Sequence, residues 1–229
     1  MSPQQKLVMK GIVGVLLIAV AVMQILFPAD DTISYISLAL IGYGLGSIPF
    51  GLLITKVMVG KDVRDIGSKN IGATNVLRTG NKLAAALTLL GDMLKGLVAV
   101  QVLAHFLHGQ PYYLLLLAIT PIIGHLFPIW LDFKGGKGVA TVLGVLLALS
   151  WQVAVLALLT WFLVVWMWRY SSLGAIIAAA SVPIYALLIS GRPLAIFGGV
   201  LSLLVIMRHK DNIVRLINGE ESKVGRRAS

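Results

Sequence analysis

Residues 134–141 read Lys-Gly-Gly-Lys-Gly-Val-Ala-Thr and link two apolar runs, Tyr112–Leu131 and Gly138–Ser150. Glycines let backbone N–H groups turn toward a ligand and approach it closely. Lys134 and Lys137 suit a phosphate or carboxylate, and the N-terminal dipole of a helix predicted from Val139 would point at the same anion. The stretch is not the P-loop of nucleotide hydrolases, because no Ser or Thr follows Lys137. Two interpretations stay open: an anion site, or glycines used for close helix packing beside solvated lysines.

The composition places this stretch in a membrane protein. Of the 229 residues 58% are apolar and 12% are charged, and the mean hydropathy is +0.93, whereas soluble domains are about a quarter charged. Apolar runs recur along the whole chain, so we predict an all-α integral membrane protein rather than a barrel. The absence of Cys excludes disulfides, thiolate metal sites and cysteine nucleophiles.

Eight apolar runs predict membrane helices: Gly11–Phe27, Ile33–Val59, Leu83–Leu107, Tyr112–Leu131, Gly138–Ser150, Trp151–Trp168, Leu173–Ser190 and Pro193–Met207. A full span needs about 20 residues, so the Gly138–Ser150 helix is expected to be shallow or tilted. A signal peptide is the alternative for Gly11–Phe27. That run exceeds a usual apolar signal region and no A-x-A-like cleavage site follows it, which favours a retained helix.

The lysines and arginines give the orientation. If eight spans alternate, all but two of the 19 fall on one side of the membrane, with Arg192 opposite and Lys95 inside a span. The positive-inside rule makes that side, and both termini, cytoplasmic. The net charge of +10 thus reflects membrane orientation, and we expect no nucleic-acid partner.

The polar clusters lie on that same predicted side. Residues 62–78 combine glycines with donors suited to phosphate oxygens, namely Ser68, Asn70, Thr74, Asn75 and Arg78. The alternative is an ordinary interhelical loop facing water. In the tail, His209 and Asn212 share a helix face three residues apart. The tail is expected to continue the last span as an amphipathic helix. The alternative is a basic helix lying on anionic lipid headgroups, which explains some of the cations but not the His-x-x-Asn spacing.

Ionisable residues also occur inside spans. Asp92 and Lys95 can pair at i, i+3, and a structural ion pair is as good an interpretation as a catalytic one. His125 near the end of its span is interpreted mainly as a packing residue.

Together these residues resemble the bacterial acyl-phosphate:glycerol-3-phosphate acyltransferase family, often called PlsY. The resemblance rests on three ordered blocks, residues 46–51 with 67–78, 124–128 with 133–141, and 208–221, and on Asp92-x-x-Lys95-Gly96. It covers about residues 33–221. The family core has seven spans, so residues 1–32 would hold one additional N-terminal helix, and 222–229 a basic cytoplasmic tail. Lys69 stands where a small residue is common, which leaves it outside the expected site.

The resemblance implies transfer of an acyl group from a fatty acyl phosphate to the sn-1 hydroxyl of glycerol 3-phosphate. The products would be lysophosphatidic acid and phosphate, at the first step of phospholipid synthesis in the bacterial inner membrane. No metal or other cofactor, acyl-CoA or acyl carrier protein is implied, and we expect a monomer in contact with membrane lipid. An acyl phosphate has a good leaving group, so positioning and charge neutralisation can supply most of the acceleration.

The resemblance also assigns roles to residues. Catalytic roles would fall to Ser68, Arg78, Lys137, His209 and Asn212, and substrate contacts to Asn70, Thr74, Asn75, Lys134, Gly135, Gly136, Gly138, Thr141 and Ser172. The glycine stretch and Thr141 would wrap the acyl-phosphate headgroup. His209 suits a general base, or it hydrogen-bonds while a substrate phosphate takes the proton.

Other functions find less support in the sequence. No His-x-x-x-x-Asp motif follows any of the four histidines, and no G-x-S-x-G elbow is present. An anion transporter could use the same glycines, with Asp92 and Lys95 as a relay, but no polar residues mark a path to the outer face. A structural scaffold would leave the polar blocks unexplained.

Overall fold

The computed structural model describes residues 32–224, and the predicted helix at Gly11–Phe27 lies outside that range. The described residues are all helical or loop, with no strand among them. The helices are α2 (Thr32–Gly46), α3 (Phe50–Val59), η1 (Val63–Asp65), α4 (Ala73–Val76), η2 (Leu77–Thr79), α5 (Lys82–Phe106), α6 (Pro111–Leu117), α7 (Thr120–Leu126), η3 (Ile129–Leu131), α8 (Val139–Leu149), α9 (Trp151–Trp168), α10 (Ser171–Ile189), α11 (Arg192–Arg208) and α12 (Lys210–Ile217).

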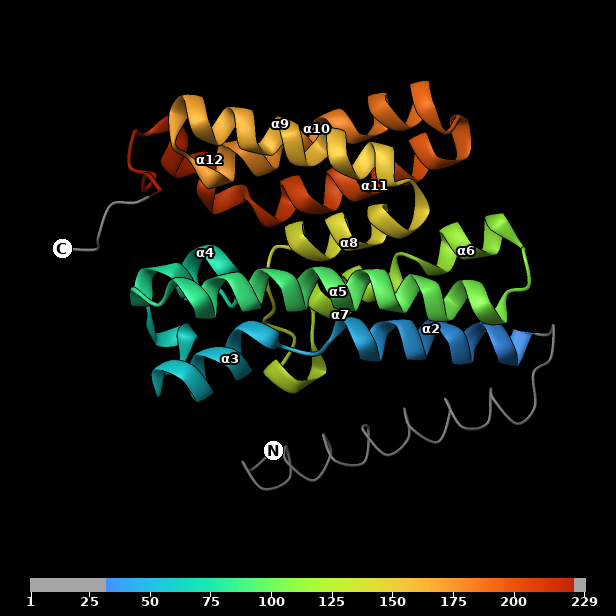
Figure 1. The fold of residues 1–229 in the computed structure, drawn as a ribbon, viewed down its shortest axis with the longest axis horizontal. Coiled ribbons are helices and arrows are strands. Elements are labelled where there is room, and N and C mark those ends of the chain that lie inside the picture. The colour runs from blue at the N-terminus through green and yellow to red at the C-terminus, as the bar shows by residue number, and fades with distance from the viewer. Residues whose placement is uncertain (1–31, 225–229) are drawn as a thin grey trace.

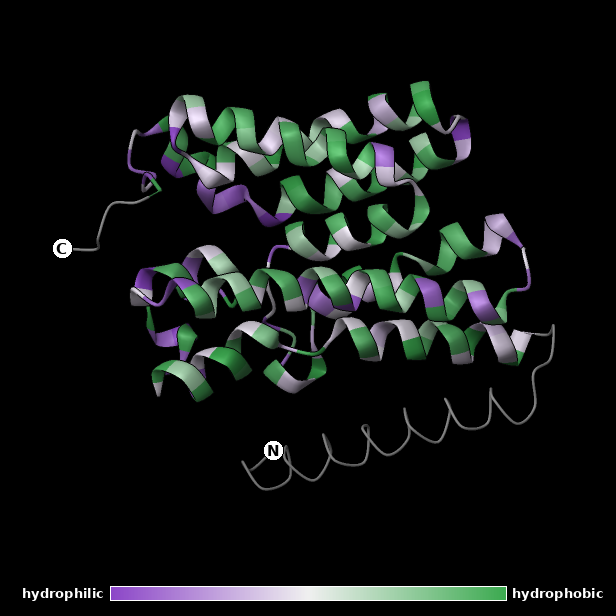
Figure 2. Ribbon diagram, viewed as in Figure 1, coloured by the Kyte–Doolittle hydropathy of each residue, from purple (hydrophilic) through white to green (hydrophobic). Residues whose placement is uncertain are grey.

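The long helices run side by side in one bundle (Figure 1). Helices α2, α3 and α5 form one side, α9, α10 and α11 form the other, and α8 lies between them, packed on both α5 and α9. Helices α4 and α12 lie at the same end of the bundle, and hydrophilic residues gather there (Figure 2). We call it the polar end.

The helices support a multi-pass integral membrane fold. Five helical segments among the described residues are long and apolar enough to cross a membrane, and α11 with α12 makes a sixth if the two count as one. Helix α8 has 11 residues, which at about 1.5 Å per residue is shorter than a bilayer core. The all-α membrane class is therefore confirmed, while the number of spans stays a prediction.

Two of the predicted helices are not continuous. The chain leaves α2 after Gly46 and resumes as α3 at Phe50. Pro49 lacks an N–H group and disfavours a helical conformation at the residue before it, which explains the break. The predicted Tyr112–Leu131 helix is divided in the same way into α6, α7 and η3. Each interrupted segment still has the length and hydropathy of one span.

The last span also differs from the prediction. Helix α12 does not continue α11 but bends away from it by 62°, with His209 at the corner. Helix α12 is amphipathic, with Asn212 buried and Ile217 79% exposed. The bend therefore turns Asn212 toward the interior at the polar end.

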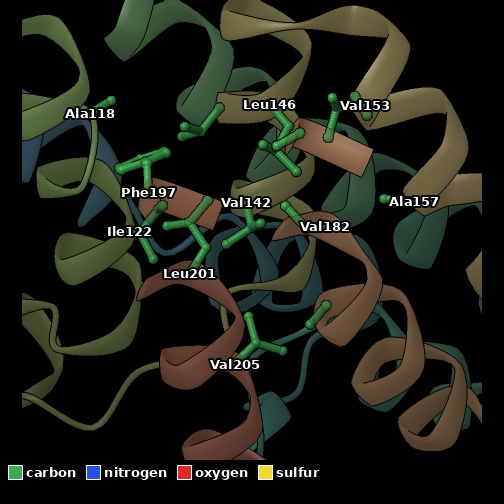
Figure 3. Close-up of a cluster of buried hydrophobic side chains, with 14 of the residues drawn as sticks. Ala118, Ile122, Val142, Leu146, Val153, Ala157, Val182, Phe197, Leu201 and Val205 are labelled. Atoms are coloured by element: carbon green, nitrogen blue, oxygen red, sulfur yellow. The ribbon is translucent and has the colours of Figure 1, made fainter. Parts of the chain in front are cut away.

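The apolar core lies between α8, α9, α10 and α11 (Figure 3). Val142 and Leu146 of α8 pack in one buried cluster with Val182, Leu201 and Val205. Since lipid is as apolar as these side chains, close van der Waals packing rather than hydrophobic transfer holds such helices together.

The contact between α5 and α8 depends on two glycines. A Cβ atom on Gly144 would overlap the Met93 carbonyl oxygen, and one on Gly96 would overlap the Thr141 carbonyl oxygen. The two backbones therefore touch directly, which fixes the start of α8 against the middle of α5.

We predict that Gly144→Ala destabilises the bundle by about 1–3 kcal/mol, because the new methyl group forces these backbones apart. The expected result is a lower midpoint of thermal unfolding in detergent. Gly199→Ala is the matched control, because a Cβ atom there meets nothing within 4 Å. Equal midpoints for the two variants would contradict this account of the packing.

Candidate active site

Two cavities adjoin near the polar end. One is polar, with a volume of about 450 Å³, and the other is largely apolar, with a volume of about 420 Å³. They share the residues Ser68, Asn70, Arg78, Lys137, Asn212, Arg215 and Ser222. Three separated chain segments thus meet at one boundary: residues 67–78, the stretch with Lys137, and the α11–α12 corner with residues 219–222.

The first segment is shaped by Asn75. Its Nδ2 donates to the carbonyl oxygens of Val63, Ile66 and Asn70 at 2.9, 2.9 and 2.8 Å, and its Oδ1 accepts the Ser68 N–H at 3.0 Å. Asn75 was predicted to contact substrate. Asn75 does line the apolar cavity, and its amide is committed to the backbone, so that it also holds Ser68 and Asn70 at the cavity wall.

Thr74 and Arg78 link this segment to other elements. The hydroxyl groups of Thr74 and Ser171, at the start of α10, lie 3.4 Å apart. The Arg78 guanidinium donates to the Ser222 hydroxyl beyond α12. Thr74 and Arg78 both line the cavities, as predicted residues of the site. Their partners Ser171 and Ser222 were not among the predicted residues.

Two N–H groups of the glycine stretch, those of Gly135 and Gly136, are bonded to backbone carbonyls of the chain itself. The Gly135 N–H donates to the Leu126 carbonyl at 3.2 Å, and the Gly136 N–H donates to the His125 carbonyl at 3.1 Å. A Cβ atom on Gly136 would overlap the His125 ring. These N–H groups were predicted to face a phosphate, but they hold the stretch against α7.

Arg208 fixes the same stretch from the other side. Its guanidinium donates to the Gly135 carbonyl at 3.3 Å and to the Gly136 carbonyl at 3.2 and 3.1 Å. Arg208 also lies over the Phe127 ring, 5.3 Å from its centroid. The stretch therefore works as a rigid support for the residue that follows it, Lys137.

Four predicted contact residues lie away from the cavities. The described residues that line the two cavities do not include Lys134, Gly135, Gly136 or Thr141. Lys134 is exposed and Thr141 is fully buried. Gly138 does line the apolar cavity, together with the first residues of α8, so the N-terminus of that helix borders the site.

Glu221 joins the third segment to the rest. Its Oε1 accepts hydrogen bonds from Ser172 and from the Asn212 side chain, both at 2.7 Å, and its Oε2 accepts from Arg215 at 2.7 Å. Asn212 in turn contacts the Lys137 amine through its Oδ1. Burial would raise the pKa of the Glu221 carboxyl, but these hydrogen bonds outweigh burial and lower it.

Glu221 and Arg215 were absent from the predicted site residues. The available signal was the Glu221 carboxylate, which together with Glu220 directly follows a basic amphipathic helix and Asn218-Gly219. Local sequence cannot show that this carboxylate reaches Ser172, which lies 49 residues away.

Lys137 is a partly buried cation at the cavity boundary. Burial lowers its pKa to about 8, and the charge of Glu221 opposes that shift. The amine is therefore mostly charged at neutral pH and becomes neutral in mildly alkaline solution.

His209 is buried at the corner between α11 and α12 and lines the apolar cavity. Its Nδ1 lies 2.7 Å from the Val205 carbonyl oxygen. A carbonyl oxygen only accepts, so Nδ1 carries the proton and Nε2 is the acceptor of the neutral ring. Burial lowers the pKa of His209 to about 4, which makes the ring a weak base.

The polar cavity carries a strong positive charge. Its lining includes five cationic side chains, Arg78, Lys137, Arg208, Lys210 and Arg215, against two carboxylates, Asp211 and Glu220. Such a cluster suits a small phosphate dianion, which accepts charge-assisted hydrogen bonds from several donors at once. No group of three or more His, Cys, Asp or Glu in residues 32–224 is arranged to hold a metal ion.

The second cavity runs from the shared polar residues into the bundle. Its apolar lining comes from four helices, α5, α8, α9 and α10, and includes Leu89, Leu90, Met93, Val142, Leu146, Ala157, Trp161, Ala175, Ala178, Ala179 and Val182. The many alanines leave room for an apolar chain between the helices. The site can thus hold a phosphate, with a second phosphorylated group bearing an apolar tail beside it.

Comparison with known proteins agrees with this geometry. Residues 36–219 match the family model described as glycerol-3-phosphate acyltransferase. A glycerol-3-phosphate acyltransferase of Mesorhizobium japonicum is 52% identical over 184 residues, covering 80% of this chain and 93% of the relative. One from Brucella anthropi is 50% identical over 199 residues, covering 86% and 97%.

Solved structures agree with the fold. The crystal structure of PlsY, an integral membrane glycerol 3-phosphate acyltransferase, in its glycerol 3-phosphate form, superposes with a TM-score of 0.78 at 36% identity. Its lysophosphatidic acid form gives 0.76 at 34% identity. Each comparison covers 84% of this chain and 96% of the other. The resemblance predicted from three sequence blocks is confirmed, and this chain belongs to the glycerol-3-phosphate acyltransferase family.

Proposed function

We propose that this acyltransferase takes its acyl group from an acyl phosphate and transfers it to the sn-1 hydroxyl of glycerol 3-phosphate. One observation carries the proposal: a cationic cavity and an apolar cavity share one wall of hydrogen-bond donors. That arrangement suits two phosphorylated substrates, one small and one with a long apolar chain. It needs no carrier protein or coenzyme for the acyl group.

In this proposal the phosphate of glycerol 3-phosphate occupies the cationic cavity, beside Arg78, Lys137 and Arg215. The acyl-phosphate headgroup lies at the shared wall, near Ser68, Asn70 and Ser172, and its chain extends between α5, α8, α9 and α10. Substrates bound in this way on the two sides of the shared wall would have the sn-1 hydroxyl beside the acyl carbon. Positioning of this kind supplies a large part of the rate enhancement.

The reaction balances without a covalent enzyme intermediate. The sn-1 oxygen attacks the acyl carbon and forms the ester bond, while the bond from that carbon to the phosphate oxygen breaks. Phosphate leaves with that electron pair and gains the proton that the hydroxyl loses. The released phosphate, a better base than a His209 ring with a pKa of about 4, is the natural acceptor. His209 Nε2 then orients the hydroxyl.

The cations also indicate where the site faces. The polar end carries the cations of α12 and of the cationic cavity, and the positive-inside rule assigns such an end to the cytoplasm. We infer a monomer in the bacterial inner membrane with its site open to cytoplasmic glycerol 3-phosphate.

The donor is tested first. Purified protein in detergent should release phosphate from a long-chain acyl phosphate only when glycerol 3-phosphate is also present, with formation of lysophosphatidic acid. Acyl-CoA should neither replace the acyl phosphate nor compete strongly with it. Turnover with acyl-CoA and none with acyl phosphate would overturn the proposed donor.

The charge requirement is tested by removing cations. We expect Lys137→Ala and Arg78→Ala each to lower kcat/KM by about 10²–10³-fold, since each removes a preorganised donor from developing phosphate charge. Lys134→Ala is the matched control, because Lys134 lies three residues from Lys137 but is exposed and outside both cavities. An equal loss in the control, or full activity in Lys137→Ala, would contradict these roles.

The pH dependence follows from Lys137. A lysine is charged below its pKa, so kcat/KM for glycerol 3-phosphate should fall as the pH rises through about 8, where the amine loses its proton. Arginine stays protonated throughout this range. Lys137→Arg, whatever its absolute rate, should therefore lack that decline. The same alkaline decline in both proteins, after subtraction of uncatalysed hydrolysis, would show that another group causes it.

A further inference from the structure

Three ionisable side chains, Asp92, Lys95 and His125, are buried in the middle of the bundle. Asp92 and His125 border the apolar cavity, but the proposed chemistry gives none of the three a step. Lys95 Nζ lies 2.8 Å from Asp92 Oδ1, and His125 Nδ1 lies 3.6 Å from the same oxygen. None of the three side chains is more than 4% exposed. Ionisable groups at this depth in a membrane are costly and are retained where they have a role.

Lys95 reaches across to the break in the first span. Its Nζ donates to the Ile48 carbonyl at 2.8 Å, directly before Pro49. The break sets the direction of α3. Gly51 of α3 packs closely on residues 67–78, because a Cβ atom on Gly51 would overlap the Ile71 carbonyl oxygen. Ile71 is the neighbour of Asn70. Lys95 thus supports residues 67–78 through α3.

His125 connects the same cluster to the second segment. Its carbonyl accepts the Gly136 N–H at 3.1 Å, and its ring fills the space that a side chain on Gly136 would need. Gly136 precedes Lys137. The orientation of His125 therefore fixes the position of Gly136, and with it that of Lys137, beside α7. Asp92 faces the His125 ring from α5.

We propose that Asp92, Lys95 and His125 are positioning residues that fix the separation of the two substrate segments. Asp92 and Lys95 stand on one turn of α5, which packs on α2, α3 and α8. Lys95 leads to the first segment through Ile48, and His125 leads to the second through Gly136. The cluster positions two substrates relative to each other and does not itself react. This inference rests on the proposed function for its kinetic test, and its structural test is independent of activity.

The structural test measures the distance between the segments. Lys69 and Lys134 are exposed and stand on the first and second segments, and the chain has no cysteine. Spin labels on Lys69→Cys and Lys134→Cys will therefore report that distance alone. In otherwise unchanged full-length protein we expect one narrow distribution by pulsed electron spin resonance. Lys95→Met and His125→Leu should each broaden or shift it.

The kinetic test uses the same substitutions in the unlabelled enzyme. Each segment keeps its own contacts, so KM for glycerol 3-phosphate should change by less than about 3-fold, while misplacement of the two substrates should lower kcat by on the order of 10²-fold. His125→Asn retains an N–H donor near the position of Nδ1 and should recover most of kcat that His125→Leu loses.

Thr88→Val is the matched control. Thr88 is fully buried on α5, one turn before Asp92, and its hydroxyl donates only within its own helix, to the Ala84 carbonyl at 2.8 Å. This variant should keep both the distance distribution and kcat.

The outcomes separate the alternatives. If Lys95→Met and His125→Leu lower only the folded yield or the unfolding temperature, with kcat and distances unchanged in the folded fraction, the cluster is merely structural and the inference is overturned. An unchanged distance distribution overturns it whatever the activity. Absence of acyl transfer in the unmodified protein would refute the proposed function, while the distances would still decide the positioning role.

Discussion

The site depends on one buried carboxylate, that of Glu221. It accepts hydrogen bonds from Ser172 on α10 and from Asn212 and Arg215 on α12, and Asn212 contacts Lys137. A carboxylate taken out of water is costly unless such donors surround it. Satisfying its oxygens therefore brings together α10, α12 and the Lys137 stretch. The cations nearby would otherwise repel one another, and this anion, with Asp211 and Glu220 in the polar cavity, reduces that repulsion.

A second constraint is that backbone polar groups inside a membrane need hydrogen-bond partners within the protein. The glycine stretch shows how this decides the function of a motif. Its N–H groups bind the carbonyls of His125 and Leu126, and its carbonyls bind Arg208. Glycine is required there because the His125 ring leaves no room for a side chain. The N–H groups of Gly135 and Gly136 are therefore not available to a phosphate, and these two residues instead fix the backbone that carries the Lys137 side chain.

Sequence patterns predicted the uninterrupted helices well. Helices α5, α9 and α10 begin and end within two residues of the predicted runs, because their limits follow from apolar length and from caps such as Asn81, whose side chain accepts the Ala84 N–H. The interruptions at Pro49 and within 111–131 were missed. Hydropathy is continuous across them, and the carbonyls they expose are satisfied by distant residues such as Lys95.

The candidate site was predictable by residue type and less so by role. Polar residues in a membrane protein stand out, so Ser68, Arg78, Lys137, His209 and Asn212 could be selected from the sequence, and the structure brings them to one pair of cavities. Their division of labour depends on contacts across the bundle. Asn75 and Asn212 are both amides in polar segments, yet Asn75 is saturated by three carbonyls and an N–H. Only the 62° bend after α11 turns Asn212 toward Lys137.

The position of His209 follows from the same bend. A straight α11–α12 helix would carry the ring along the surface, with its pKa close to that of imidazole in water. At the corner the ring is instead buried, its Nδ1–H donates to the Val205 carbonyl, and burial lowers its pKa to about 4. Such a ring offers a fixed acceptor to a hydroxyl without removing its proton. If the donor is an acyl phosphate, the leaving phosphate accepts the proton of the hydroxyl, and the reaction does not need a base stronger than the buried His209 ring. The burial of His209 is therefore consistent with the proposed acyl-phosphate donor.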